Sequence, residues 1–303
     1  MADGKTGTEG FIPFREWRIG YRIVGRQEDP RHLPLLCLHG GPGSTFDYLE
    51  PLEALAAAGR QVIFYDQLGN GRSGRPADPS LWTVDLFLEE LATVRRALGL
   101  TQVHLLGQSW GGMLAMEYAV TRPRGLASLV LADAPASTAQ WVAEINRLRA
   151  ELPKEVQAVL LRHEAAGTTA DPAYQEAMLV FYRRHVCRLD PWPDCLMRTF
   201  RQLTESPEVY LTLWGPSEFH VTGTLKEWQV LDRLGRITTP TLVVGGRHDE
   251  ATPIVTGAVH RAIAGSEWVL FEESSHMPHL EETPRFLKIV GDFLASGEAA
   301  LPA

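Results

Sequence analysis

Gly107-Gln108-Ser109-Trp110-Gly111 is the stretch of this chain that decides its fold. It follows the apolar run Val103-His104-Leu105-Leu106 directly and is followed by Gly112-Met113-Leu114-Ala115-Met116, so a strand is expected to pass into a helix here. A serine flanked by glycines at such a turn is typical of a nucleophile elbow, because larger residues two positions either side of the serine would collide. We therefore expect Ser109 to stand exposed at the tip of the strand.

Short continuous apolar runs recur along the chain and alternate with helical patterns. The runs cover 35–38, 61–65, 103–106, 126–131, 241–244 and 268–271, and the helical patterns cover 46–58, 84–98, 111–122, 254–264 and 283–294. Continuous apolar runs are typical of parallel strands covered on both faces. Their alternation with helices predicts an α/β fold with a mostly parallel, doubly wound sheet and right-handed crossovers. An alternating pattern over 10–14 and 17–25 predicts a hairpin of edge strands.

The alternation breaks between about residues 136 and 235, where only helical patterns occur. They cover 139–150, 154–166, 172–188, 195–203 and 209–214. We interpret this stretch as an all-helical cap over the strand ends, where open α/β sheets place their ligands. The alternative is an appendage that only stabilises the fold. The predicted organisation is a core made of residues 1–135 and 236–303, interrupted by a cap of residues 136–235.

Charge and composition exclude several classes of function. The 303 residues are 45% hydrophobic and 22% charged and carry a formal net charge of -8, which argues against nucleic acid or an anionic membrane as a partner. No apolar run approaches the roughly 20 residues of a membrane span. Residues 1–10 are polar and glycine-rich, unlike a signal peptide, so we expect a cytoplasmic protein. The sequence assigns no oligomeric state.

The three cysteines indicate neither disulfides nor a metal site. Cys37 lies in an apolar run, Cys187 and Cys195 lie in the helical stretch, and no spacing typical of zinc ligands occurs. We expect reduced, structural thiols. No metal and no organic cofactor is predicted.

The loop His39-Gly40-Gly41-Pro42-Gly43 follows the run 35–38. Small residues there leave backbone N–H groups free to bind a developing oxyanion. We assign the predicted oxyanion hole to the N–H groups of Gly41 and Trp110. A plain tight turn is the alternative, whereas a phosphate loop is not favoured because no Gly-Lys-Ser/Thr follows.

Ser109 needs a base and an acid from loops after other strands. The loop after 268–271 offers His276 and His279, of which we prefer His276 because His279 falls at a helix entrance. Asp249 follows 241–244, whereas Asp133 follows 126–131. The chain order serine, acid, histidine of hydrolase triads is met by Ser109, Asp249 and His276, so Asp249 is the preferred acid and Asp133 is interpreted as a structural or cap-hinge residue.

Several longer motifs carry a family resemblance over nearly the whole chain. They are His39-Gly40-Gly41-Pro42-Gly43, Tyr65-Asp66-Gln67-Leu68-Gly69-Asn70-Gly71-Arg72-Ser73, Gly107-Gln108-Ser109-Trp110-Gly111-Gly112, Gly215-Pro216-Ser217-Glu218-Phe219 with Thr222-Gly223-Thr224 and Trp228 after it, and His248-Asp249-Glu250-Ala251-Thr252-Pro253. In these motifs the chain resembles the proline iminopeptidases, aminopeptidases of the α/β-hydrolase fold that include the tricorn-interacting aminopeptidases. Gln108, Leu68 and Asn70 depart from the strict pattern, which leaves the preference for proline open.

The resemblance implies a site for a free amine. In that family two glutamates hold the α-amino group of the substrate, and they match Glu218 and Glu250. A protonated amine in a partly dry pocket needs charged acceptors, and carboxylates supply strong hydrogen bonds. Five aromatic residues are candidates for an apolar wall around the first side chain of the substrate: Phe46, Trp110, Phe181, Tyr182 and Trp214.

The resulting hypothesis is a serine aminopeptidase that acts through an acyl-enzyme. It would release proline, or another small or apolar N-terminal residue, from short peptides or amides with a free N-terminus. Related amino acid amidases, or a general esterase of the same fold, are the alternative. A non-catalytic ligand-binding protein is a third possibility, against which the complete set of catalytic residue types argues.

Overall fold

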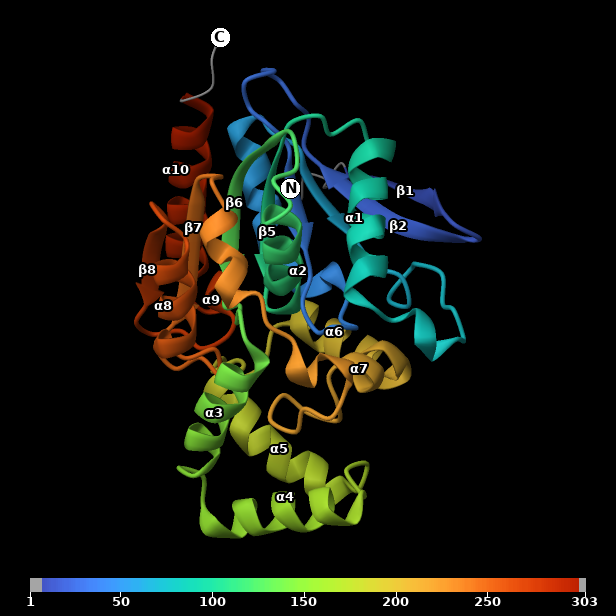
Figure 1. Ribbon diagram of the computed structural model, residues 1–303, viewed down its shortest axis with the longest axis vertical. Coiled ribbons are helices and arrows are strands. Elements are labelled where there is room, and N and C mark those ends of the chain that lie inside the picture. The colour runs from blue at the N-terminus through green and yellow to red at the C-terminus, as the bar shows by residue number, and fades with distance from the viewer. Residues whose placement is uncertain (1–6, 300–303) are drawn as a thin grey trace.

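The computed structural model describes residues 7–299, and within them eight strands form one sheet (Figure 1). The predicted core also includes residues 1–6 and 300–303, which lie outside the described residues. Most of the polar N-terminal stretch belongs to residues 1–6. The strands are β1 (Gly7–Phe14), β2 (Trp17–Val24), β3 (Leu35–Leu38), β4 (Val62–Tyr65), β5 (Val103–Gln108), β6 (Leu126–Ala132), β7 (Thr241–Gly246) and β8 (Glu267–Phe271). Their order is β1-β2-β4-β3-β5-β6-β7-β8; β2 is antiparallel to both β1 and β4, and the other neighbouring pairs are parallel.

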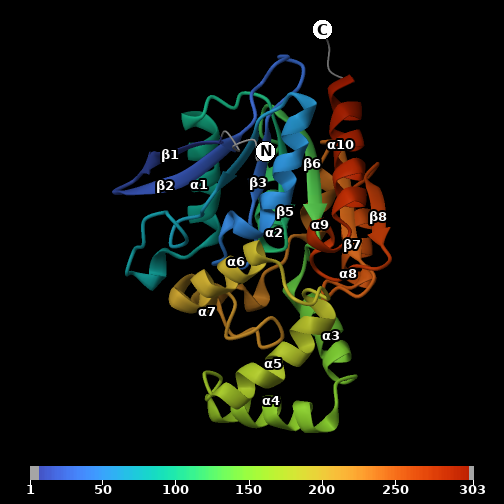
Figure 2. The same ribbon diagram turned by 180° about the vertical axis from the view of Figure 1, so that it is seen from behind.

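Helices cover both faces of the sheet, as the alternating pattern predicts. One face carries α1 (Val84–Ala97), α2 (Trp110–Ala119) and α8 (Pro253–Ala262), and the other carries η1 (Phe46–Ala58) and α10 (Thr283–Ala299) (Figures 1 and 2). The short helices η2 (Pro79–Leu81), η4 (Leu231–Arg236) and α9 (Pro278–Glu281) lie in connections. Within residues 7–299 no helix combines the length and apolar character needed to cross a bilayer.

The segment between β6 and β7 contains no strand of the sheet. It holds α3 (Thr138–Arg149), α4 (Lys154–Ala166), α5 (Pro172–His185), α6 (Asp194–Glu205), α7 (Glu208–Leu213) and η3 (Thr224–Glu227). In Figures 1 and 2 these helices lie beyond the end of the sheet at which β6 finishes. We name residues 136–235 the cap segment, which is our proposed division of the chain.

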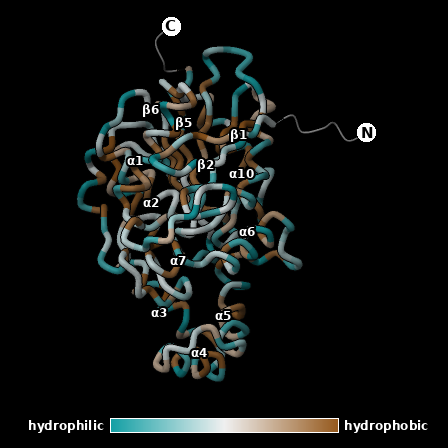
Figure 3. The backbone as a smooth tube through the Cα atoms, turned by 90° about the vertical axis from the view of Figure 1, so that its right-hand side faces the viewer, coloured by the Kyte–Doolittle hydropathy of each residue, from teal (hydrophilic) through white to brown (hydrophobic). Residues whose placement is uncertain are grey.

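The packing of the sheet follows from its sequence. Strands β3, β4, β5 and β7 are buried along their whole length, because helices cover them on both sides. Figure 3 shows the hydrophobic stretches inside the molecule and the hydrophilic turns at its outside. Polar side chains begin two of the helices: Thr83 accepts a hydrogen bond from the Leu86 N–H, and Ser137 accepts one from the Gln140 N–H. The three cysteines are free thiols.

Three local predictions differ from the structure. The helix over 46–58 forms with 3₁₀ turns and contains Pro51, which has no N–H to donate to a regular helix. Strand β8 was expected to be covered on both faces, but it pairs only with β7 at the sheet edge and is mostly exposed or half-buried. Of the two strands predicted at an edge, only β1 lies there, because β2 pairs with both β1 and β4.

The tight turn at Gly107 gives a stability prediction. A Cβ atom at Gly107 would lie 2.2 Å from the Gly111 carbonyl oxygen, so Gly107→Ala should lower the free energy of unfolding by about 3 kcal/mol. Gly99→Ala is the matched control, because Gly99 has a φ of +68° but no atom within 4 Å of the added Cβ. There the backbone conformation alone should cost roughly 1 kcal/mol. Urea unfolding measures both, and equal losses would contradict the steric explanation.

Candidate active site

The elbow at Ser109 is built from a strained turn between β5 and α2. Ser109 has φ 54° and ψ -122°, its N–H donates to the Ala132 carbonyl at 2.9 Å, and its own carbonyl accepts the Met113 N–H at 3.1 Å. A Cβ atom at Gly111 would lie 2.2 Å from the Leu38 carbonyl oxygen. With the equally close approach at Gly107, these contacts explain why both flanking positions are glycine.

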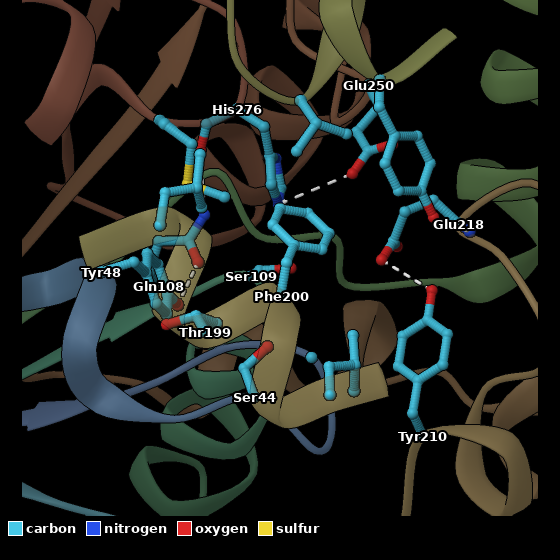
Figure 4. Close-up of a pocket in the computed structure, with 16 residues that line it drawn as sticks. Ser44, Tyr48, Gln108, Ser109, Thr199, Phe200, Tyr210, Glu218, Glu250 and His276 are labelled. Atoms are coloured by element: carbon cyan, nitrogen blue, oxygen red, sulfur yellow. Dashed lines mark hydrogen bonds and ion pairs between the residues drawn. The ribbon is translucent and has the colours of Figure 1, made fainter. Parts of the chain in front are cut away.

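The structure brings most of the predicted site residues to one pocket between the sheet and the cap segment. Ser109, His276, Gly41, Glu218 and Glu250 all line it (Figure 4). Four of them follow strands of the sheet, and Glu218 comes from the cap segment after α7. Because the carboxyl ends of parallel strands meet at one edge, loops far apart in sequence converge there.

His276 is held by Asp249. Its Nδ1 lies 2.7 Å from Asp249 Oδ1, which also accepts the Ala251 N–H at 2.8 Å. Burial of His276 favours the neutral ring, but the charge and hydrogen bond of Asp249, together with the charges of Glu218 and Glu281, outweigh burial and raise the pKa of His276 above its usual value. Among the hydrogen bonds of the described residues there is none between Ser109 and His276. The Nε2 atom of His276 instead lies 3.8 Å from Glu250 Oε1 (Figure 4).

The competing histidine serves packing. His279 is 1% exposed, its Nε2 lies 3.2 Å from the Tyr48 carbonyl oxygen, and its ring contacts Phe286. Burial lowers the pKa of His279 to about 3, so the ring is neutral.

The glycine-rich loop is braced by buried polar contacts. His39 Nε2 accepts the Gln67 N–H at 2.9 Å, and Gln67 Nε2 donates to the His39 carbonyl at 3.0 Å. Gly41, at φ 110°, has no room for a side chain, because a Cβ atom would lie 2.5 Å from the Gly43 nitrogen. Trp110 is the first residue of α2, so its N–H has no acceptor within the helix. The N–H groups of Gly41 and Trp110 thus remain our proposed oxyanion donors.

Glu218 is positioned by aromatic side chains of the cap segment. Tyr210 donates its hydroxyl hydrogen to Glu218 Oε1 at 2.8 Å. The Glu218 N–H donates to the Tyr182 hydroxyl at 3.2 Å, and Trp141 Nε1 donates to the Glu218 carbonyl at 3.0 Å. The Trp141 ring also stands edge-on to His276, with centroids 6.1 Å apart. The cap segment therefore contacts the candidate base as well as the candidate amine site.

Glu250 is an acid without a hydrogen-bond donor. Its side chain is buried, and neither carboxyl oxygen accepts a hydrogen bond. Burial raises the pKa of Glu250 well above its usual range, and the nearby charges of Glu218 and Asp249 raise it further. Burial likewise raises the pKa of Glu218 to about 7, against the opposing hydrogen bond from Tyr210. Such an arrangement is satisfied by a cationic group that contacts both carboxylates.

The apolar wall of the pocket differs from the one expected. Of the five aromatic candidates only Tyr182 lines the pocket, and Phe46, Trp110, Phe181 and Trp214 do not. The Trp110 ring points elsewhere because its Nε1 donates to Gln67 Oε1 at 2.8 Å. The other apolar lining side chains are Val186, Leu196, Phe200, Leu203, Tyr210 and Met277. A helical pattern identifies buried faces but does not tell a pocket wall from a core contact.

Sequence reasoning also missed a polar bridge beneath the pocket. Tyr48 accepts the Gly40 N–H at 2.7 Å and donates to Gln108 Oε1 at 2.6 Å, and Gln108 Nε2 donates to the His276 carbonyl at 2.9 Å. This chain of hydrogen bonds joins the glycine-rich loop to the loop that carries His276. The only sequence signal was the amide side chain at position 108, directly before Ser109.

Comparison with known proteins shows a match over most of the chain. Residues 34–283 match the family model of the alpha/beta hydrolase fold. A proline iminopeptidase of Clostridium botulinum is 41% identical over 288 residues, covering 95% of this chain and 98% of the relative. The crystal structure of VinJ is 47% identical with a TM-score of 0.93, covering 95% and 98% of the two chains. That of a Mycobacterium smegmatis proline iminopeptidase is 43% identical with a TM-score of 0.90, covering 97% and 99%.

Reaction with a fluorophosphonate probe tests the predicted nucleophile. We expect the probe to label Ser109, and Asp249→Asn to slow labelling by roughly 10³- to 10⁴-fold, because an uncharged partner no longer fixes the tautomer of His276 or stabilises its cation. Asp232→Asn, at an exposed position in η4, is the matched control and should label at the normal rate. Absence of labelling in the unchanged protein would revive the non-catalytic hypothesis, and fast labelling of Asp249→Asn would exclude Asp249 as the acid.

Proposed function

We propose that this chain, which belongs to the proline iminopeptidase family of the α/β-hydrolase fold, removes the N-terminal residue from short peptides or amino acid amides. It is a serine hydrolase of the prolyl aminopeptidase type. The observation that supports this function most directly is the carboxyl pair Glu218 and Glu250, which lines the same pocket as Ser109 and His276.

The proposed chemistry begins at Ser109. His276 Nε2 takes the Ser109 proton while Oγ attacks the carbonyl carbon of the first residue, and Asp249 stabilises the resulting imidazolium. The N–H groups of Gly41 and Trp110 bind the oxyanion. The tetrahedral intermediate then loses the leaving amine, which takes its proton from His276. A water molecule repeats the sequence on the acyl-enzyme and releases the free amino acid.

The carboxyl pair explains why cleavage would stop after one residue. In the free enzyme, burial raises the pKa of Glu250 well above its usual range and that of Glu218 to about 7. An ammonium group that contacts both carboxyls favours their ionised forms and forms charge-assisted hydrogen bonds. An acylated N-terminus supplies neither the charge nor those donors. With the amine fixed beside Glu218 and Glu250, the first carbonyl is the one that reaches Ser109.

The apolar wall suits a small or apolar first side chain. Leu196, Phe200 and Leu203 project from α6, and Val186 follows α5, so the cap segment supplies most of the apolar surface near Ser109. Proline or another compact apolar residue would bury its side chain there, and the hydrophobic effect favours this by about 25 cal/mol for each Å² of apolar area. A polar or charged first residue would have no partner on this wall.

Removal of the Glu250 charge should reduce activity on substrates with a free amine. We expect Glu250→Gln to lower kcat/KM for proline p-nitroanilide at least about tenfold, because loss of one partner of a desolvated ion pair costs roughly 2–5 kcal/mol. Glu155→Gln, at an exposed position in α4, is the matched control. The unchanged protein should hydrolyse N-acetylproline p-nitroanilide far more slowly than the free-amine substrate. Equal rates would favour the esterase or general amidase alternative instead.

The pH profile should report the ionisation of Glu218. Because its pKa is raised to about 7, Glu218 is neutral in acid and loses its attraction for an ammonium group as the pH falls through 7. A peptide α-amino group loses its charge above about 7.7–8.0, so kcat/KM for a free-amine peptide should peak in the narrow range between. Glu218→Gln should remove the part of the acid limb near pH 7 that comes from Glu218 and leave the parts that belong to Glu250 and His276. An unchanged acid limb in Glu218→Gln would contradict the assignment.

A further inference from the structure

A second acid lies beside Asp249, and the proposed reaction does not use it. Asp133 follows β6, is 0% exposed and has φ 54°, a conformation that a residue other than glycine seldom adopts. Its N–H donates to the Val244 carbonyl at 2.9 Å, which fixes the backbone against β7. The side chain is therefore held in place next to the loop that carries Asp249.

The carboxyl groups of Asp133 and Asp249 are both buried, and they lie close enough for the charge of Asp249 to act on Asp133. Asp249 Oδ1 already accepts from His276 Nδ1 and from the Ala251 N–H, whereas Asp249 Oδ2 is buried and accepts no well-aligned hydrogen bond from an N–H or hydroxyl group. The same is true of both carboxyl oxygens of Asp133. A hydrogen bond between two carboxyl groups requires a proton on one of them, and such a bond would give the buried Asp249 Oδ2 the donor that it lacks.

The surroundings decide which acid keeps the proton. Asp249 is stabilised as an anion by the imidazole and by a backbone N–H. Asp133 is buried beside the negative charge of Asp249, and both effects raise its pKa well above the usual range. The charge of Glu281 raises the pKa of Asp133 further, and a hydrogen bond from the backbone of Gly246 lowers it. Tyr48, the other titratable group whose charge would interact with Asp133, is itself kept neutral by burial.

We propose that Asp133 is a positioning residue, a neutral carboxylic acid that donates its hydrogen to Asp249 Oδ2 and so holds Oδ1 against His276 Nδ1. The inference rests on the proposed function for the roles of Asp249 and His276. Asp249 then has a donor on each oxygen, and its plane is fixed by three contacts instead of two. The proton stays on Asp133 throughout the reaction.

A neutral Asp133 also matters for the basicity of His276. A second carboxylate beside Asp249 would stabilise the imidazolium further and leave less of the free base at neutral pH. A protonated acid supplies the same hydrogen bond without that charge. Asparagine would do likewise, because its side-chain NH₂ can donate to Asp249 Oδ2, whereas alanine cannot.

Two variants at this position test the inference. The readouts are kcat for proline p-nitroanilide and the rate of fluorophosphonate labelling of Ser109, both measured from pH 5 to 10. We expect Asp133→Ala to lower both rates at least about tenfold, and Asp133→Asn to restore them to within about threefold, with the acid limb at its original pH. Any alkaline decline in labelling that comes from ionisation of Asp133 should be absent from Asp133→Asn.

Each contrary result overturns the inference. Full activity of Asp133→Ala would show that Asp249 needs no second donor, and an Asp133→Asn variant as slow as Asp133→Ala would show that the carboxyl group itself is required. If Asp133→Ala fails to fold, the position of the acid limb of Asp133→Asn still tests whether Asp133 is neutral. A shift of that limb to lower pH would mean that Asp133 carries a negative charge in the unchanged protein.

The two readouts separate this inference from the proposed function. Fluorophosphonate labelling depends on Ser109, His276 and Asp249 but needs no free amine. A protein that labels normally and does not hydrolyse proline p-nitroanilide would contradict the aminopeptidase function, and the labelling rates of the Asp133 variants would still test the positioning role.

Discussion

The close approach of α2 to the strands beside it is the constraint on which the rest of the site depends. At Gly111 a methyl group would lie 2.2 Å from the Leu38 carbonyl oxygen, so the start of α2 contacts the end of β3 directly. This contact brings the glycine-rich loop beside Ser109, because a Cβ atom at Gly40 would lie 3.0 Å from the Ser109 Cβ atom. Without it, the serine and the loop would each keep its local structure and lose their relation to each other.

A concentration of buried acids around a single histidine is the second organising feature. Asp249, Glu250 and Glu218 all lie within its electrostatic reach, and Asp133 lies behind Asp249. Burial away from water penalises each ionised carboxylate, and the charges repel one another, so the four acids do not all ionise together. Asp249 contacts the imidazole and a backbone N–H, whereas burial raises the pKa values of Asp133, Glu250 and Glu218 above their usual range. Similar side chains thereby serve different purposes.

Local patterns predicted the sheet and the loops that carry the site, because buried strands and tight glycine turns are determined by residues that are close together in the sequence. Ser109, Gly41 and His276 followed from such patterns, Glu218 and Glu250 followed only from the family resemblance, and the structure brings all five to one pocket. The contacts that orient them were not predicted, since Tyr48, Tyr210 and Gln108 act across segments that meet only in the folded chain. The orientation of the Trp110 ring was missed for the same reason, because it depends on a hydrogen bond to Gln67. The exposed position of β8 depends on the order of strands in the sheet, which no single segment of sequence specifies.

Glu218 and Glu250 belong to different segments of the chain. Glu218 is held by Trp141, Tyr182 and Tyr210 of the cap segment, whereas Glu250 follows a strand of the sheet. Any cation that contacts both carboxylates is therefore a noncovalent cross-link between cap and sheet. The cap segment is covalently joined to the core only at its two ends, but ion pairs such as Arg198 with Asp47 and Glu50 also hold it there. If the proposed function holds, binding of a charged N-terminus would therefore also stabilise the contact between cap and sheet.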